Sequence, residues 1–209
     1  MSYRQIAGII LPILVDQAFV VGLNMINTVL ISSSGMAALS AVSMVDSINL
    51  LLINVFIALA TGGTVIVAQY KGNDNEAMLS KATATSIAVD FLAGGGIGAL
   101  MLVFHTQLLW VLFGRADADV MRNAVVYLIG CSISYVGIAV EQAVCGALRG
   151  VGETRSALLL SLIMNLSYVA FNIVFVSILR MGVWGMAIAV NLSRYLGAAC
   201  SLWLLRGSR

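Results

Sequence analysis

The fold is decided by stretches such as residues 44–70, MVDSINLLLINVFIALATGGTVIVAQY, in which Asp46 is the single charged residue. A helix needs about 20 mostly apolar residues to cross about 30 Å of hydrocarbon, so this stretch is long enough to span a bilayer. Of the 209 residues, 61% are apolar and 10% are charged, and the mean hydropathy is +1.03. Soluble domains carry about 25% charged residues. The composition therefore predicts a membrane protein.

Polar breaks divide the chain into six apolar segments of this length. We predict helices near residues 5–31, 44–70, 82–104, 118–145, 156–178 and 184–205. In lipid every backbone polar group has to be satisfied internally, which favours helices. A β-barrel would show alternating apolar and polar residues, and runs such as Ile48–Ala60 do not alternate. The predicted fold class is all-α, a polytopic membrane protein with six transmembrane helices.

Short polar or glycine-rich turns, such as Ser32–Gly35 and Arg149–Arg155, separate the predicted spans. The longest predicted connection is His105–Asp119, of which Leu108–Phe113 is expected to lie in the membrane interface. Short connections favour antiparallel neighbours and hence an up-down bundle. Because no linker or shift in composition is visible, residues 1–209 are predicted to form a single transmembrane domain.

The basic residues predict the orientation, because loops on the cytoplasmic side carry an excess of lysine and arginine. One side of the predicted bundle has seven of them: Arg4, Lys71, Lys81, Arg149, Arg155, Arg206 and Arg209. The other side has three: Arg115, Arg122 and Arg180. We expect a multi-pass protein of the cell membrane with both termini in the cytoplasm. The net charge of only +2 indicates no nucleic-acid partner, so the lipid bilayer is the first expected partner.

No motif in the sequence indicates an enzyme. There is no glycine-rich loop ending in Lys-Ser or Lys-Thr, no His-Glu-x-x-His and no Cys-x-x-Cys. Cys131, Cys145 and Cys200 fall within predicted spans at a spacing that fits no metal motif, so we interpret them as small packing residues. His105, at a span end, is interpreted as an interfacial residue rather than a ligand. We expect no metal and no cofactor.

Four of the nine acidic residues lie inside predicted spans: Asp16, Asp46, Asp90 and Glu141. A charge at the bilayer centre costs roughly 2.5–3.5 kcal/mol on insertion scales, and such residues usually mark ion or substrate pathways. A buried carboxylate also favours its protonated form, which suits it to taking up and releasing protons. All four are therefore candidates for an ion-coupling role.

The first span is the most informative of the six. Asp16 and Asn27 are 11 residues apart, about three helical turns, and so share one face. Gln17, next to Asp16, is a further candidate. Pro12 can kink the start of this helix and free carbonyls toward a cavity. The alternative is that the polar side chains of this face only make hydrogen bonds between helices.

Other spans carry polar stripes at helical spacing, which can converge on a shared cavity. The fifth span has Ser161, Asn165, Tyr168 and Asn172. The fourth has Tyr127, Cys131, Ser134, Glu141 and Cys145, with Gln142 beside them. The third has Thr83, Ser86 and Asp90, and the sixth has Asn191 and Arg194. These side chains are predicted to line a pathway, and packing between helices is again the alternative.

Three features have competing interpretations. Asp46 lies near the start of its predicted span, where a helix cap is as reasonable as an ion role. Arg194 is expected to neutralise a nearby acid, either Glu141 or Asp16, because buried cations are usually paired. The glycines at positions 94, 95, 96 and 98 are expected to let helices approach closely or bend.

The order of several short segments resembles the MATE (multidrug and toxic compound extrusion) transporters. The segments are Pro12 in the first span, Ile26–Leu30, Ala58–Thr64, Ala68–Gly72, Ala147–Arg155 and Gly182–Ala189. The resemblance covers nearly the whole chain. It implies an antiporter that uses a proton or sodium gradient to expel amphipathic, often cationic, drug-like compounds.

Such transporters have twelve helices in two six-helix lobes that face a central cavity, and this chain is similar to the N-terminal lobe. The resemblance therefore implies a second six-helix lobe as partner, either in the same longer chain or in a dimer. Two alternatives remain open. One is a flippase for lipid-linked compounds or polysaccharides in the same superfamily, and the other is a membrane scaffold that does not transport.

The chain departs from the family at the positions that bind the coupling ion. The family commonly has an aspartate on the first helix where this chain has Asn27, and a family Asn and Asp on the fifth helix align with Tyr168 and Asn172. An amide can ligate an ion but cannot take up a proton. The resemblance therefore indicates Asp16 as the coupling acid, with Glu141 second.

Overall fold

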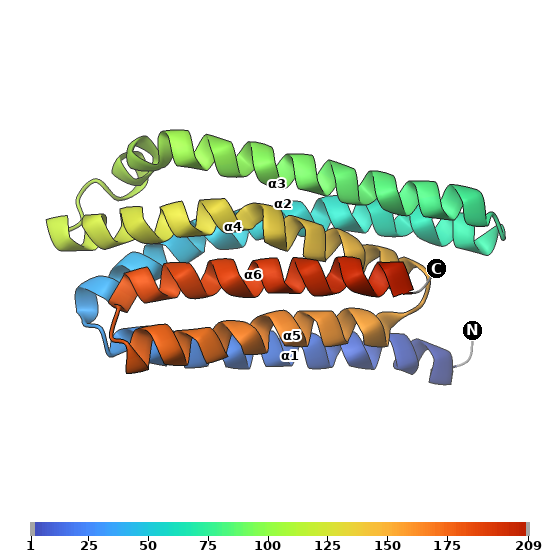
Figure 1. The fold of residues 1–209 in the computed structure, drawn as a ribbon, viewed down its shortest axis with the longest axis horizontal. Helices are drawn as coiled ribbons and strands as arrows, with labels where there is room; N and C mark the ends of the chain where they lie inside the picture. Colours follow the sequence, from blue (N-terminus) through green and yellow to red (C-terminus); the bar gives the residue numbers. More distant parts are fainter. Residues whose placement is uncertain (1–2, 208–209) are drawn as a thin grey trace.

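Six long helices lie side by side in one bundle (Figure 1). The computed structural model describes residues 3–207, and the side chains of residues 10–11 and 14–206. The helices are α1 Tyr3–Ser32, α2 Met36–Gly72, α3 Glu76–Phe113, α4 Ala118–Gly150, α5 Thr154–Asn172 and α6 Gly182–Gly207. A short π-helical segment, η1 Ile173–Ile178, continues α5. Six stretches are long and apolar enough to cross a membrane, which agrees with the predicted all-α fold.

Two helices, α2 and α3, exceed their predicted lengths by ten residues or more. α2 begins at Met36 instead of residue 44, and α3 runs over Glu76–Phe113 instead of 82–104. The predicted long connection over 105–119 is therefore wrong, since only residues 114–117 connect α3 to α4. Leu109, which was expected in the interface, is fully buried in the core. The prediction counted the residues needed to cross hydrocarbon, whereas these helices continue beyond that length, because their end segments also consist of helix-forming residues.

α4 is the central helix and packs against α2, α3 and α6. Glycines allow its close approach to α3. A Cβ added at Gly98 would lie 2.7 Å from the carbonyl oxygen of Ser132, and one at Gly94 would lie 2.8 Å from the Cβ of Ala139. Neither Gly95 nor Gly96 has a neighbour within 4 Å of such an added atom. Close approach thus explains two of the four glycines.

α1 packs mainly against α5 and touches its chain neighbour α2 only slightly. α1 and α5 are parallel, because both run from the end that holds the α4–α5 connection to the end that holds the α5–α6 connection (Figure 1). One side of α1 consequently stays uncovered, and Met25 and Val29 on it are 67% and 70% exposed. The predicted kink at Pro12 falls on a residue whose side chain lies outside the described part.

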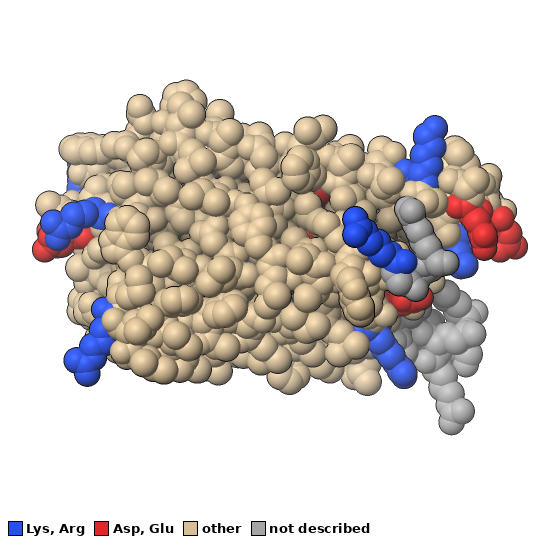
Figure 2. All heavy atoms as spheres, in the orientation of Figure 1, with Lys and Arg blue, Asp and Glu red and all other residues tan. Residues whose placement is uncertain are grey.

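On the face shown in Figure 2, charged residues gather at the two ends of the bundle, and the surface between them is almost free of charge. The start of α1 and the end of α6 lie at the same end, together with the α2–α3 and α4–α5 connections (Figure 1). An uncharged belt between two charged rims is the pattern expected of a bundle that lies across a bilayer. Of the basic residues used for the orientation, Arg4 and Arg209 lie outside the described side chains.

Candidate functional site

The first polar cluster surrounds Asp46, on the side of α2 that the rest of the chain leaves exposed. Asp46 Oδ1 accepts hydrogen bonds of 3.2 Å from Asn49 Nδ2 and of 3.2 Å from the hydroxyl of Tyr127. Asn49 in turn accepts a hydrogen bond of 2.6 Å from the hydroxyl of the buried Tyr135. Asp46 lies ten residues inside α2, so the interpretation of Asp46 as a helix cap is wrong.

The hydroxyl of Tyr127 also lies 3.3 Å from the hydroxyl of Tyr168 on α5. Because Tyr127 has one hydroxyl proton and donates it to Asp46, Tyr168 is the donor in this second bond. The result is a directed chain of hydrogen bonds from α5 through α4 to the carboxylate on α2. It joins three helices at the exposed side of the bundle.

Arg194 belongs to this cluster and not to the acids that were predicted as its partners. Its Nη1 donates a hydrogen bond of 2.7 Å to Ser134 Oγ, and its guanidinium lies 6.0 Å from the ring centroid of Tyr135. It is also close enough to Asp46 for electrostatic attraction. The predicted pairing with Glu141 or Asp16 is therefore wrong. The rotation of α6 about its axis decides which helix Arg194 faces, and helical spacing does not reveal that rotation.

Asn27 and Asn172 form a buried pair of amides between α1 and α5. Asn172 Nδ2 donates a hydrogen bond of 2.7 Å to Asn27 Oδ1. The Oδ1 atom of Asn172 is buried and has no partner among the described residues. The π-helical segment η1 begins at the next residue, and such segments are frequent at functional sites. The pair is uncharged, so it can ligate an ion or a polar group but cannot carry a proton.

The second polar cluster surrounds Asp16, which is 5% exposed. Its Oδ1 accepts a hydrogen bond of 2.6 Å from Ser161 on α5, and its Oδ2 lies 3.7 Å from Arg149 Nη2 at the end of α4. Asp16 and Asn27 both bond to α5, as expected from their position on one face of α1. Asn165, one turn after Ser161, donates to the carbonyl and hydroxyl oxygens of Ser161.

Glu141 is fully buried on α4 beside this second cluster. Its carboxylate accepts hydrogen bonds of 3.0 Å from Gln142 Nε2 and of 3.2 Å from Cys145 Sγ. It is close enough to both Arg149 and Asp16 to interact with them electrostatically. Two acids and one base therefore meet where α1, α4 and α5 come together.

The remaining predicted site residues lie outside the two polar clusters. Asn191 Nδ2 donates hydrogen bonds of 2.8 Å to the carbonyl oxygens of Gly130 and Ala187, which joins α6 to α4 as packing. Gln17 is exposed. Asp90 lies on α3, away from both clusters, and its carboxylate is buried with no hydrogen-bond partner among the described residues.

Sequence reasoning missed three members of the clusters: Asn49, Tyr135 and Arg149. Asn49 carried a usable signal, because it is an amide inside a span one turn after Asp46. Tyr135 and Arg149 carried none. A tyrosine in an apolar run and an arginine at a helix end are common, and their partners lie on other helices.

Comparisons with known proteins identify the family of this chain. The family model MatE matches residues 12–176. Uncharacterized transporter YisQ of Bacillus subtilis is 26% identical over 191 residues, covering 89% of this chain and 41% of YisQ. Probable multidrug resistance protein NorM of Thermotoga maritima is 21% identical over 206 residues, covering 97% of this chain and 44% of NorM.

Solved structures show the same fold. A MOP superfamily transporter from Pyrococcus furiosus superposes with a TM-score of 0.90 at 20% identity, covering 97% of this chain and 44% of that one. An outward-facing multidrug resistance MATE family transporter gives a TM-score of 0.90 at 19% identity, with coverage of 97% and 44%. The chain thus spans less than half the length of these relatives. This multi-pass membrane protein belongs to the MatE family and has the fold of one six-helix lobe of a MATE transporter.

Proposed function

We propose that this chain is one lobe of an antiporter that exports amphipathic, often cationic, drug-like compounds in exchange for protons or sodium ions. The observation that carries the proposal is the polar stripe of α5. At Ser161 it is bonded to a carboxylate on α1, and at Tyr168 it is linked through Tyr127 to a carboxylate on α2.

The spacing along this stripe suits an ion pathway. Ser161 and Tyr168 are seven residues apart, which is about 10 Å along the helix axis. Asp16 and Asp46 therefore lie at different depths, and the polar side chains of the α5 stripe lie between them. Asn27 and Asn172 form the uncharged pair further along the same face. Coupling in this lobe then depends on Asp16 and Asp46, with Glu141 as a third acid beside Asp16.

The stripe requires a second lobe to complete a closed pathway. Asp46 is exposed, and so are the apolar side chains of α1 at Met25 and Val29. Transporters commonly place the substrate between two related halves. We propose that the partner is a second six-helix lobe, in the same longer chain or in a two-fold dimer. The excess of basic residues in the segments at the end where α1 begins supports a cytoplasmic location for both termini.

The environment of Arg194 favours drug export over the flippase alternative. A flippase for anionic lipid-linked compounds needs positive charge that faces its cavity. Arg194 is only 8% exposed, and its guanidinium is turned toward Ser134 and Tyr135. The exposed acid of this region is Asp46, which attracts cations.

The test is uptake of a fluorescent lipophilic cation into inverted membrane vesicles that contain the full-length protein. Uptake should require a proton or sodium gradient, and applying each gradient separately identifies the coupling ion. Asp74→Asn, an exposed acid in the α2–α3 turn, is the matched control and should transport normally. Movement of a fluorescent lipid-linked sugar without any cation uptake would instead identify a flippase. A protein that moves neither compound would be a scaffold.

A further inference from the structure

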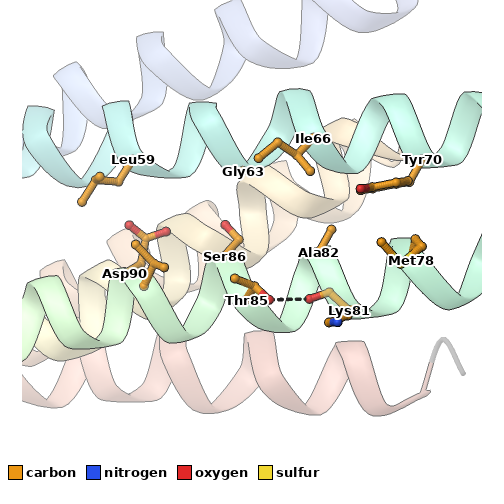
Figure 3. Close-up of a pocket in the computed structure, with 11 residues that line it drawn as sticks. Leu59, Gly63, Ile66, Tyr70, Met78, Lys81, Ala82, Thr85, Ser86 and Asp90 are labelled. Carbon is orange, nitrogen blue, oxygen red and sulfur yellow. Dashed lines mark hydrogen bonds between the residues drawn. The ribbon is translucent and has the colours of Figure 1, made fainter.

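A pocket of about 320 Å³ lies between α2 and α3, apart from the two polar clusters (Figure 3). Its walls on α2 include Leu59 and Ile66, and its α3 side includes Ser86 and Asp90. Ile66 is 50% exposed, so the pocket opens at the outer surface of the bundle. Its volume falls within the range of pockets that hold small ligands.

Asp90 is buried at the deep end of this pocket. It is 1% exposed, and neither of its carboxylate oxygens has a hydrogen-bond partner among the described residues. Figure 3 shows the carboxylate pointing from α3 toward Leu59 on α2, with the hydroxyl of Ser86 one turn away. Buried polar groups in proteins almost always have a partner, so a group with two free acceptor atoms indicates a missing ligand. An ionisable residue inside a span points to the same conclusion.

The walls of the pocket suit an organic ammonium group better than a metal ion. Metal ions such as calcium and magnesium take six or more oxygen ligands, whereas the pocket walls beside Asp90 are mostly aliphatic. No group of three His, Cys, Asp or Glu residues able to hold a metal occurs in the described part of the chain. An ammonium group with an apolar chain suits both features, because its N–H groups bond to the carboxylate and its chain lies against Leu59, Ile66 and Val89.

The positive charge of Lys81 affects where a cation can bind in the pocket. Lys81 lines the pocket nine residues before Asp90 on α3, about 13 Å along the axis. Tyr70 and Met78 lie still further from Asp90 (Figure 3). The positive charge of Lys81 disfavours an ammonium group nearby, so the favoured place for such a group is at Asp90. A volume of about 320 Å³ is at the lower end of the range of ligand pockets, so the pocket suits a short ligand.

We propose that the pocket between α2 and α3 is a binding site for a short protonated alkylamine, whose ammonium group is held by Asp90. The ligand enters from the surrounding bilayer, past the exposed side chains of Ile66 and Val89. The site is separate from the stripe of α5, and the proposal does not depend on the proposed transport function.

The experiment measures equilibrium binding of radiolabelled octylamine to the full-length protein in nanodiscs, with partitioning into empty nanodiscs subtracted. Octanol has the same number of non-hydrogen atoms and no charge, so it is the matched ligand. Asp90→Asn keeps the shape of the side chain and should weaken octylamine binding at least tenfold while leaving octanol binding unchanged. Ala82→Trp fills the pocket and should abolish binding of both. Asp74→Asn should bind octylamine like the unmodified protein.

Equal octylamine affinity in the unmodified protein and Asp90→Asn would overturn the proposal, and so would binding no greater than to empty nanodiscs. If Asp90→Asn does not elute as a single species, Ala82→Trp alone decides, because unchanged binding in a filled pocket contradicts the site. Cation export should persist in Asp90→Asn. Loss of export with unchanged octylamine binding would count against this site and in favour of a transport role for Asp90.

Discussion

Replacing Asp16 by asparagine separates a coupling role from a structural one. The side-chain amide keeps an oxygen that accepts the hydrogen bond of 2.6 Å from Ser161. The substitution removes the negative charge and with it the contact of 3.7 Å to Arg149. The Asp16 side chain is 7% exposed, but that of Arg149 is 31% exposed and reaches water when the contact is lost, so the value of about 0–1 kcal/mol for exposed pairs applies. We therefore expect the free energy of unfolding to fall by no more than about 1 kcal/mol.

The expected effect on transport is much larger. A gradient of one pH unit is worth about 1.4 kcal/mol per proton, which sustains a tenfold substrate gradient if one proton is exchanged for one substrate molecule. A side chain that cannot take up a proton cannot draw on this energy. In inverted vesicles with an imposed gradient of one pH unit, Asp16→Asn should bring the accumulation ratio of a fluorescent lipophilic cation close to one. Protein amount and unfolding in mixed detergent micelles should stay near those of the unmodified protein.

Two results would refute this reasoning. Accumulation that survives in Asp16→Asn with the same pH dependence would show that coupling lies elsewhere, and Asp46→Asn is then the next variant to measure. A loss of stability of several kcal/mol would show that the pair with Arg149 is structural. Asp74→Asn is the control, because it removes an exposed acid in the α2–α3 turn and leaves Asp16 unchanged, and it should retain the accumulation.

Three further predictions follow from the packing and the topology. Gly98→Ala should lower the free energy of unfolding by about 1–3 kcal/mol, because the added Cβ would lie 2.7 Å from the α4 backbone. Gly96→Ala, where an added Cβ has no neighbour within 4 Å, should raise the free energy of unfolding by up to about 1 kcal/mol. Equal effects of the two variants in a detergent unfolding titration would contradict the packing. A cysteine at Ser33 should react with an impermeant thiol reagent added outside cells and one at Asn73 should not, and the opposite labelling would invert the orientation. Tyr127→Phe should lower the free energy of unfolding by about 0.6 kcal/mol and by at most about 1.7 kcal/mol. It should nevertheless change the pH profile of export, because it removes the hydrogen bond to Asp46. An unchanged pH profile would show that this hydrogen bond is not part of the pathway.

The sequence allowed some of the site to be predicted along with the fold. The stripe of α5 and the shared face of Asp16 and Asn27 follow from helical spacing, and both appear in the structure. The stripe assigned to α4 behaves differently. Tyr127 faces α2 and α5, and Ser134 faces Arg194 on α6. Glu141 accepts its hydrogen bonds from Gln142 and Cys145, which belong to its own helix. α4 is buried among several helices, so polar residues at one helical spacing still meet different partners.

What the sequence by itself determined is the class of solvent, the number of helices and the face that each polar residue occupies. These depend on hydrocarbon thickness and helix geometry, which are the same whatever the neighbours are. The tertiary structure alone decided the partners: Asp16 with Arg149, Arg194 with Ser134, and, among the described residues, no hydrogen-bond partner for the Asp90 carboxylate. Partners such as Asp16 and Ser161 are 145 residues apart, and they meet only because α1 packs against α5 in one rotation and register. That choice results from the combined packing of all six helices, and no local pattern in the chain encodes it.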